Sequence, residues 1–315
     1  MVTNFYRRYQ QDMSSAYHRI SSGGKLIETA CGPIQYTEFG DGPPMLMVHG
    51  AGGGYDQGTY FAKLIGENYR WIAPSRFGFL GTPVPDHANS LLQADAHAAL
   101  LDALSIDQVG VVGVSMGGPS SLLFTLQYPQ RTKSLVMISA ASHAIPPRPA
   151  ILAALFNLFL NDFVFWSLVR LSPEGLLAAL GVPSEVQKRL GPDETTQLHA
   201  FLESIIPMAA RRKGQLLEQH MSEYEAEQIK HIQTPTLVLH ARDDTLISFE
   251  QGEFTARNIL GARFIPMEQG GHLALMLKSN AKVKEKILDF LEEHNRDDVT
   301  KIPATPIKGD ILCGN

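Results

Sequence analysis

The stretch Val109-Gly110-Val111-Val112-Gly113-Val114-Ser115-Met116-Gly117-Gly118 decides the fold of this chain. Its valine-rich first half predicts a buried strand, because β-branched side chains are enriched in strands. A helix-forming segment follows at residues 120–128. Ser115 lies between the two in a Gly-x-Ser-x-Gly pattern. This context predicts a sharp, strained turn that presents a serine hydroxyl at the end of the strand.

The two glycines of the pattern explain how such a turn can form. Gly113 and Gly117 lack Cβ atoms, so the strand and the helix can approach each other closely. A serine hydroxyl presented in this way can attack a carbonyl carbon once a base removes its proton. The pentapeptide also recurs by chance in unrelated chains, so its interpretation depends on the segments around it.

Short apolar segments alternate with helical ones through most of the chain. The expected strands are 25–29, 34–39, 45–48, 71–73, 109–114, 135–139, 236–240 and 263–267. The expected helices between them are 91–104, 120–128, 250–259 and 280–294. This alternation predicts an α/β fold, with a mostly parallel central sheet and helices on both of its faces.

The alternation stops between residues 142 and 231, where helical patterns are interrupted by prolines and no strand is expected. An insertion of this length exceeds a simple crossover connection, so we expect an all-helical cap over the carboxyl edge of the sheet. The expected organisation is an N-terminal helical arm at 1–24, a core at 25–141 and 232–295, the cap at 142–231 and a flexible tail at 296–315.

The composition is that of an ordinary globular protein, with 315 residues, 44% of them hydrophobic, and a formal net charge of −5. Acidic residues outnumber basic ones, which argues against a nucleic-acid partner. The short Arg211-Arg212-Lys213 cluster is interpreted as a solvated helix end. Residues 1–20 lack the apolar core of a secretory signal, which predicts a cytoplasmic protein.

The two cysteines, Cys31 and Cys313, lie near opposite ends of the chain without the spacing of a zinc site or a redox pair. They are compatible with a disulfide and equally with a reducing compartment. The sequence contains no cluster of metal ligands and no dinucleotide motif. We therefore expect neither a metal nor an organic cofactor. The expected partner is a small-molecule substrate.

The longest apolar stretch, residues 151–169, approaches the length of a membrane span. Asn161 and Asp162 lie near its middle, where an unpaired carboxylate is costly in lipid. A buried or pocket-lining helix is therefore expected rather than a stable membrane span.

A glycine-rich loop, His49-Gly50-Ala51-Gly52-Gly53-Gly54, directly follows the expected strand at 45–48. Such a loop can aim the backbone N–H of Ala51 at a developing oxyanion, with the N–H of Met116 as the second donor. A plain tight turn is the alternative. A phosphate-binding loop is disfavoured because no Gly-Lys-Ser/Thr ends the segment.

An acid and a histidine follow the last two expected strands. Asp243 and Asp244 come after strand 236–240, where a carboxylate can orient an imidazole. Asp244 is preferred because the turn into residues 246–247 directs it inward, and Asp243 is the alternative, with a turn role as its ordinary interpretation. Gln269-Gly270-Gly271-His272 follows strand 263–267, and its glycines allow the loop to bring His272 over the sheet edge as the base.

The chain order serine, aspartate, histidine is that of the α/β-hydrolase triad. On the motifs His49-Gly50, Gly113 to Gly118, Asp244 to Ile247 and Gly271-His272, the chain resembles an α/β-hydrolase with a helical cap, over about residues 32–294. The resemblance implies Ser115 as nucleophile, His272 as base, Asp244 as the residue that orients it, and Ala51 and Met116 as oxyanion donors. Two positions depart from many relatives: Ser248 replaces a common proline, and Pro74-Ser75-Arg76-Phe77-Gly78 replaces a common Asp-x-Arg-Gly.

The same resemblance implies hydrolysis of carboxylic esters through an acyl-enzyme, as in esterases. Dehalogenases and the usual epoxide hydrolases of this fold use aspartate as nucleophile, so Ser115 argues against both. Amides, thioesters and lactones remain open as substrates because the attack chemistry is shared. Two other functions also remain open. One is a hydrolase of carbon–carbon bonds in β-diketones or vinylogous ketones, in which Arg76 or Arg170 would hold a carboxylate. The other is a small-molecule receptor with slow turnover.

The substrate pocket is expected between the glycine-rich loop and the cap. Gly52 and Arg76 are its candidates on the core, and Phe156, Phe159, Phe163 and Trp166 on the cap. Together with Leu152, Leu155, Leu160 and Phe165, these cap side chains could line a wide apolar pocket for an acyl or aromatic group. The equally weighted alternative is that these side chains only pack the cap onto the core. A helix that is apolar on all sides is expected to be buried, but its sequence does not show which element it packs against.

Overall fold

A computed structural model of the chain describes residues 2–146, 149–218, 221 and 224–295. The expected tail at 296–315, with Cys313, lies outside these residues. The centre of the fold is an eight-stranded sheet in the order β1-β2-β4-β3-β5-β6-β7-β8. β1 pairs with β2, and β2 with β4, in antiparallel fashion, and the remaining neighbours are parallel. The mostly parallel sheet predicted from the sequence is confirmed.

All eight strands lie within three residues of their expected positions. Their bounds are Lys25–Thr29 (β1), Gly32–Phe39 (β2), Pro44–Val48 (β3), Arg70–Pro74 (β4), Val109–Val114 (β5), Thr132–Ile138 (β6), Thr236–Ala241 (β7) and Arg263–Met267 (β8). β5 is buried at every residue, which explains why its sequence is apolar throughout rather than alternating.

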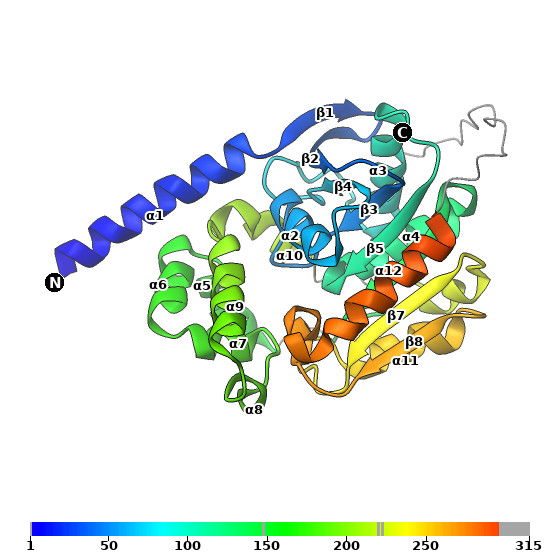
Figure 1. Cartoon of the computed structure of the whole chain (residues 1–315). Coiled ribbons are helices and arrows are strands. Elements are labelled where there is room, and N and C mark those ends of the chain that lie inside the picture. The colour runs from blue at the N-terminus through cyan, green and yellow to red at the C-terminus, as the bar shows by residue number, and fades with distance from the viewer. Residues whose placement is uncertain (1, 147–148, 219–220, 222–223, 296–315) are drawn as a thin grey trace.

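Helices cover both faces of this sheet (Figure 1). Their bounds are Tyr55–Ile65 (α2), Ser90–Ala103 (α3), Gly118–Gln127 (α4), Phe249–Asn258 (α11) and Ala281–Asn295 (α12). Successive side chains of a strand point to opposite faces. In β3, Met45 and Met47 therefore pack in the layer of α2 and α12, whereas Leu46 and Val48 pack in the layer of α3 and α4.

The insertion between β6 and β7 is helical, and its described residues contribute no strand to the sheet. Its helices are Ala150–Phe159 (α5), Asp162–Leu171 (α6), Pro173–Ala179 (α7), Ser184–Gln187 (α8), Pro192–Ser204 (α9) and Arg212–Leu217 (α10). In Figure 1 most of them form a green group beside the sheet. α6 packs on α7 and α9, so the cap has apolar contacts of its own.

The first helix, Val2–Ser22 (α1), packs on this cap. The rings of Phe5 and Tyr9 contact the Trp166 ring on α6, at centroid distances of 4.7 and 5.4 Å. The Trp166 indole N–H donates to Asp12 at 2.9 Å, and Arg170 donates to the same carboxylate at 2.8 Å. Segments about 150 residues apart in sequence are therefore joined by one aromatic and ionic contact.

Among the described residues, no single helix is long and apolar enough to cross a membrane. Ile151–Phe159 and Asp162–Leu171 pass that test of length and composition only as a pair, and they meet at an angle of 86°. The bend falls at Asn161, whose side chain accepts hydrogen bonds from the N–H groups of Phe163 and Val164 and so begins a new helix.

β8 is the last strand of the sheet and contains Pro266. The carbonyl of Met267 accepts a hydrogen bond from Arg242 N–H, just after β7, at 2.9 Å. Backbone groups of alternate strand residues point to opposite sides. Pro266 therefore lies at a position whose backbone groups face away from β7.

Candidate active site

The serine turn is built as a continuous strand, tight turn and helix. β5 ends at Val114, residues Ser115–Gly117 form one 3-10 turn, and α4 begins at Gly118. Ser115 has a φ of 51°, a strained conformation for a residue with a side chain. A Cβ at Gly117 would lie 2.4 Å from the carbonyl oxygen of Val48, so only glycine permits this approach to β3.

Ser115, His272 and Asp244 form one chain of hydrogen bonds. Ser115 Oγ lies 2.9 Å from His272 Nε2, and His272 Nδ1 lies 2.8 Å from Asp244 Oδ2. With the proton on Nδ1, Nε2 is free to accept the proton of the serine hydroxyl. The three side chains come from the ends of β5, β7 and β8, which meet at the carboxyl edge of the sheet.

The Asp244 carboxylate is fully buried and surrounded by donors. Its Oδ1 accepts the N–H groups of Leu246 and Ile247 at 2.9 and 3.0 Å. His240 Nε2 lies 3.3 Å from Oδ2. Burial acts to raise the pKa of Asp244, but attraction to His272 and hydrogen bonds from both histidines outweigh it and hold that pKa well below its usual range. An ionised acid here can stabilise an imidazolium.

Asp243 holds the loop that carries the histidine. Its carboxylate accepts the backbone N–H groups of Gly270 and Gly271 at 3.1 and 2.8 Å. On the other side of the loop, His272 N–H donates to the carbonyl of Gly181 in the cap at 2.8 Å. The two neighbouring aspartates therefore have different partners: Asp244 meets the imidazole, and Asp243 meets the backbone before it.

The glycine-rich loop after β3 contacts Ser115 directly. A Cβ at Gly50 would lie 2.8 Å from Ser115 Cβ. Gly50 N–H donates to the side-chain oxygen of Gln57 at 2.9 Å, and Gln215 donates to the carbonyl of Ala51. Ala51 lines the same cavity as Ser115 and His272, while Met116 follows Ser115 in the 3-10 turn.

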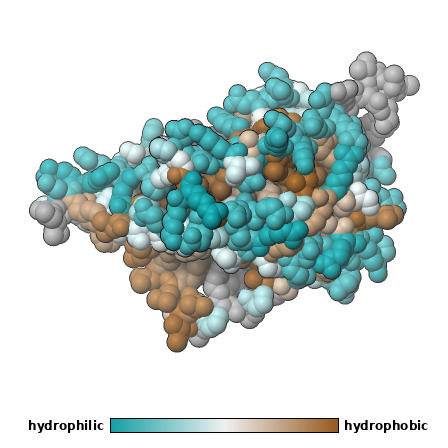
Figure 2. All heavy atoms as spheres, turned by 60° about the horizontal axis from the view of Figure 1, so that its bottom comes forward, coloured by the Kyte–Doolittle hydropathy of each residue, from teal (hydrophilic) through white to brown (hydrophobic). Residues whose placement is uncertain are grey.

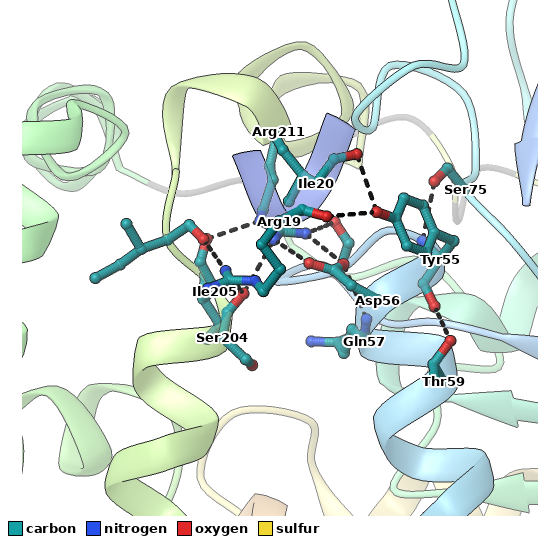
Figure 3. Close-up of polar contacts among 12 residues, drawn as sticks. Arg19, Ile20, Tyr55, Asp56, Gln57, Thr59, Ser75, Ser204, Ile205 and Arg211 are labelled. Carbon is teal, nitrogen blue, oxygen red and sulfur yellow. Dashed lines mark hydrogen bonds and ion pairs between the residues drawn. The ribbon is translucent and has the colours of Figure 1, made fainter. Parts of the chain in front are cut away.

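Arg211 ties this loop to the cap (Figure 3). Its guanidinium donates to the carbonyls of Gly53, Ile205 and Ser204 at 2.6, 2.7 and 3.0 Å. It also forms a two-pronged ion pair with Asp56 in the first turn of α2, at 3.0 and 2.6 Å. The side chain is fully buried, so the expectation of a solvated helix end at this residue is wrong. Its partners, brought together by folding, satisfy the charge.

The N-terminal helix joins the same network. Arg19 donates to the carbonyl of Ser204 at 3.1 Å and to that of Ile206. The Tyr55 hydroxyl, on α2, donates to the carbonyl of Ile20 at 2.9 Å. Figure 3 shows these groups between α1, α2 and the end of α9. α1, the cap and the first turn of α2 therefore meet at one set of hydrogen bonds.

A cavity of about 490 Å³ opens at Ser115 and His272. Its core-side lining is Gly50, Ala51, Gly52, Gln57, Phe61, Val114, Ser115, Leu246, His272 and Leu273. Its cap-side lining is Leu152, Leu155, Phe156, Phe159, Phe165, Ala179, Leu180, Phe201, Ile205, Met208 and Gln215. No aspartate, glutamate, lysine or arginine is among these described lining residues, and the amides of Gln57 and Gln215 supply most of the polarity besides Ser115 and His272.

The family model for the alpha/beta hydrolase fold matches residues 43–279, well over half of the chain. The chain belongs to the α/β-hydrolase family.

Its relatives have more than one activity. A 2-hydroxy-6-oxo-6-phenylhexa-2,4-dienoate hydrolase of Comamonas testosteroni is 27% identical over 82% of this chain and 91% of its own length. Lipase 1 of Psychrobacter immobilis is 26% identical over 86% of this chain and 82% of its own length. The solved structure of an alpha/beta hydrolase fold protein from Nakamurella multipartita is 28% identical, with a TM-score of 0.74, over 85% of this chain and 98% of that one.

Four side chains expected at the substrate pocket of this hydrolase are not among the described residues that line the cavity: Trp166, Phe163, Arg76 and Leu160, which is buried in the core. Trp166 is buried beneath α1, with its indole N–H on Asp12. Phe163 contacts the rings of Phe5 and Tyr9 instead. On α6, which begins after the bend at Asn161, Phe165 lines the cavity, whereas Phe163 and Trp166 pack against α1.

Arg76, expected on the core side of the substrate pocket, also lies outside the described cavity lining. Its side chain is 1% exposed, donates to the carbonyl of His49 at 2.9 Å and pairs with Glu218. Arg170, the other arginine considered for a carboxylate, pairs with Asp12 and Glu203. The guanidinium groups of Arg76 and Arg170 therefore bind partners outside the cavity lining of this hydrolase.

The structure brings the remaining expected residues together at the cavity or beside it: Ser115, His272, Asp244, Ala51, Met116, Gly52, Phe156 and Phe159. Sequence reasoning missed the contribution of α9 and of α2. Phe201 and Ile205, one helical turn apart, form part of the wall, as does Phe61. The spacing of Phe201 and Ile205 predicts a shared helix face, but not which neighbour that face meets.

Proposed function

We propose that this hydrolase cleaves carboxylic esters with apolar acyl or aromatic groups, using Ser115 as the nucleophile. The observation that carries the proposal is the combination of the Ser115–His272–Asp244 hydrogen-bond chain with a largely apolar cavity whose described lining contains no acidic residue, lysine or arginine. Burying an apolar acyl chain there is favourable, whereas burying an ionised group without a partner is costly.

The mechanism follows from the geometry of the site. Ser115 Oγ attacks the ester carbonyl carbon while His272 Nε2 takes its proton, and buried Asp244 stabilises the imidazolium that forms. The N–H groups of Ala51 and Met116 would receive the negative charge on the carbonyl oxygen, each contributing about 3 kcal/mol in the transition state. The alkoxide leaves with the proton of His272, and water then releases the acid by the same steps.

A second candidate is hydrolysis of carbon–carbon bonds, as the name of the Comamonas relative indicates for that enzyme. Such a dienoate substrate carries a carboxylate, which needs a cation or a set of donors. In this chain Arg76 and Arg170 are engaged elsewhere, and among the described lining residues only Gln57 and Gln215 offer side-chain amides beside the catalytic groups. We therefore rank this activity below ester hydrolysis.

The test compares both substrate classes with matched proteins. Wild type, Ser115→Ala and the exposed control Ser248→Ala are assayed on p-nitrophenyl esters from acetate to palmitate and on 2-hydroxy-6-oxo-6-phenylhexa-2,4-dienoate. We expect wild type and Ser248→Ala to hydrolyse the esters, and Ser115→Ala to lose at least about a thousandfold in kcat while its thermal unfolding stays cooperative. Serine-dependent cleavage of the dienoate without ester turnover would replace the proposal with the second candidate.

A further inference from the structure

The helix α5 exposes apolar side chains to an unusual degree. Ile151, Leu152, Leu155 and Leu158 are 76, 52, 57 and 57% exposed. No residue of α5 carries a charge. Figure 2 shows a protruding hydrophobic region, in brown, on the lower side of the molecule. Scattered apolar side chains are common on protein surfaces, but a contiguous protruding cluster marks an interaction surface.

This exposed surface is continuous with the catalytic cavity. Leu152 and Leu155 are more than half exposed and also line the cavity, while Phe156 and Phe159 of the same helix lie further in. An apolar molecule that contacts the outside of α5 therefore reaches Ser115 along apolar side chains. A surface that only covered the core would not need to border the opening of the cavity.

The helices α6 and α1 carry further exposed aromatic and basic residues. Phe163, at the start of α6, is 41% exposed and contacts Phe5 of α1. α1 in turn exposes Tyr6, Arg7 and Arg8. Aromatic side chains and arginines beside an apolar helix are typical of segments that lie at the boundary between lipid and water.

We propose that α5 docks on a lipid surface and receives an amphiphilic ester from it. A second copy of the chain is the competing occupant. Four partly exposed aliphatic side chains offer on the order of a few hundred Å², below the roughly 800 Å² that each partner buries in a stable dimer. A protruding uncharged helix instead fits a fluid acyl layer, because insertion there needs no complementary surface.

Binding is measured with the full chain and does not require turnover. Ser115→Ala is mixed with phosphatidylcholine–phosphatidylserine vesicles and separated by flotation. The same assay is run on Ser115→Ala with Ile151→Ser and Leu158→Ser, two exposed positions outside the cavity lining. The matched control carries Leu26→Ser and Leu260→Ser, which are 61 and 92% exposed on the core.

We expect the parent and the control to float with the vesicles, and the α5 variant to lose at least about tenfold in partitioning. Failure of the parent to float, or equal floating of the α5 variant, overturns the proposal. So does a dimer in solution that the α5 substitutions dissociate, because a second copy then covers the helix.

The uptake of an ester from the lipid surface rests on the proposed function, whereas the binding of α5 to that surface does not. On the wild-type background, the α5 substitutions should leave hydrolysis of a soluble p-nitrophenyl ester unchanged and lower hydrolysis of an ester held in vesicles about tenfold. Floating without any ester hydrolysis would reject the proposed function and leave docking intact. Ester hydrolysis without flotation would reject docking and leave the proposed function intact.

Discussion

Asp243 and Asp244 are adjacent carboxylates whose partners give them different tasks. Asp244 accepts from the His272 imidazole and from two backbone N–H groups, and its pKa is held low against the effect of burial. Asp243 accepts from the two backbone groups that precede His272. One carboxylate therefore contacts the imidazole, and the other holds the loop that carries it.

Replacing each aspartate by asparagine separates these tasks. Asp244→Asn keeps an acceptor for the loop but presents the wrong group to the imidazole, so we expect kcat to fall by about 10⁴-fold. Asp243→Asn keeps one acceptor for the glycine loop, and we expect a loss of less than about a hundredfold. Steady-state kinetics on one ester measures both. A larger loss in Asp243→Asn would reassign the acid.

At this scale the sequence predicts residues that act through local turns and fails for those held by distant ones. Ser115 and His272 lie in glycine-containing loops just after strands, and such context is readable in the chain. Trp166 and Arg76 look like pocket residues in sequence. Their partners, Asp12 and Glu218, lie 154 and 142 residues away, so no local pattern indicates that they are engaged.

Among the structural elements, Arg211 makes several of the hydrogen bonds between cap and core. The guanidinium joins Gly53, in the glycine-rich loop, to the end of α9 and to the first turn of α2. Removing this buried arginine takes away both hydrogen bonds that its guanidinium donates to Asp56 and the three that it donates to carbonyl groups.

Arg211→Met should therefore lower the free energy of unfolding by about 3–5 kcal/mol, the usual result of breaking a buried ion pair. Arg212→Met, at the exposed neighbouring position, is the control and should change it by less than about 1 kcal/mol. Urea denaturation of both variants measures the difference. Equal effects of the two substitutions would show that Arg211 does not anchor the cap.

Two elements show what local patterns cannot supply. The expected helices do not include α2, whose central Gly58 lowers helix propensity; in the structure a Cβ at Gly58 would lie 2.9 Å from that of Ala73. By composition residues 151–169 form one apolar stretch, but in the structure Asn161 begins a separate helix. An asparagine in an apolar stretch opposes a membrane span by its polarity, and here it also caps a helix.

In the whole molecule, each face of the sheet is closed by a helical layer, and the layer of α3 and α4 contains a buried histidine. His97 lies on α3 with its ring 6.4 Å from that of Phe124 and its Nε2 3.3 Å from Ser120 Oγ. Burial, with a smaller contribution from Arg76, lowers the pKa of His97 to about 3.

This histidine should make the protein sensitive to acid. The unfolded chain binds a proton at His97 below about pH 6.5, whereas the folded chain binds it only near pH 3, so the unfolding free energy falls as the pH drops between these values. The slope is more than about 1 kcal/mol per pH unit in the middle of this window. His97→Gln should reduce the slope measured by urea denaturation, and the exposed control His18→Gln should not. Parallel slopes for wild type and His97→Gln would contradict the assignment.

The global architecture is the level at which the sequence was most informative. The α/β class, the strand positions and the helical insertion all follow from the alternation of short apolar strands with helices, because a parallel sheet needs a long connection between neighbouring strands. The way in which α1 crosses the cap was not predictable, since it depends on Phe5, Tyr9 and Asp12 meeting Trp166 at long range.

Pro266 has a consequence for how copies of this protein behave when they are crowded. An outermost strand can capture a strand from another molecule through its free N–H and C=O groups, which is a common route to aggregation. At Pro266 the outward-facing position has no N–H to offer, and the exposed Arg263 adds a charge at the start of the same strand. Edge-to-edge growth of the sheet is therefore discouraged at β8 by the covalent structure of one residue.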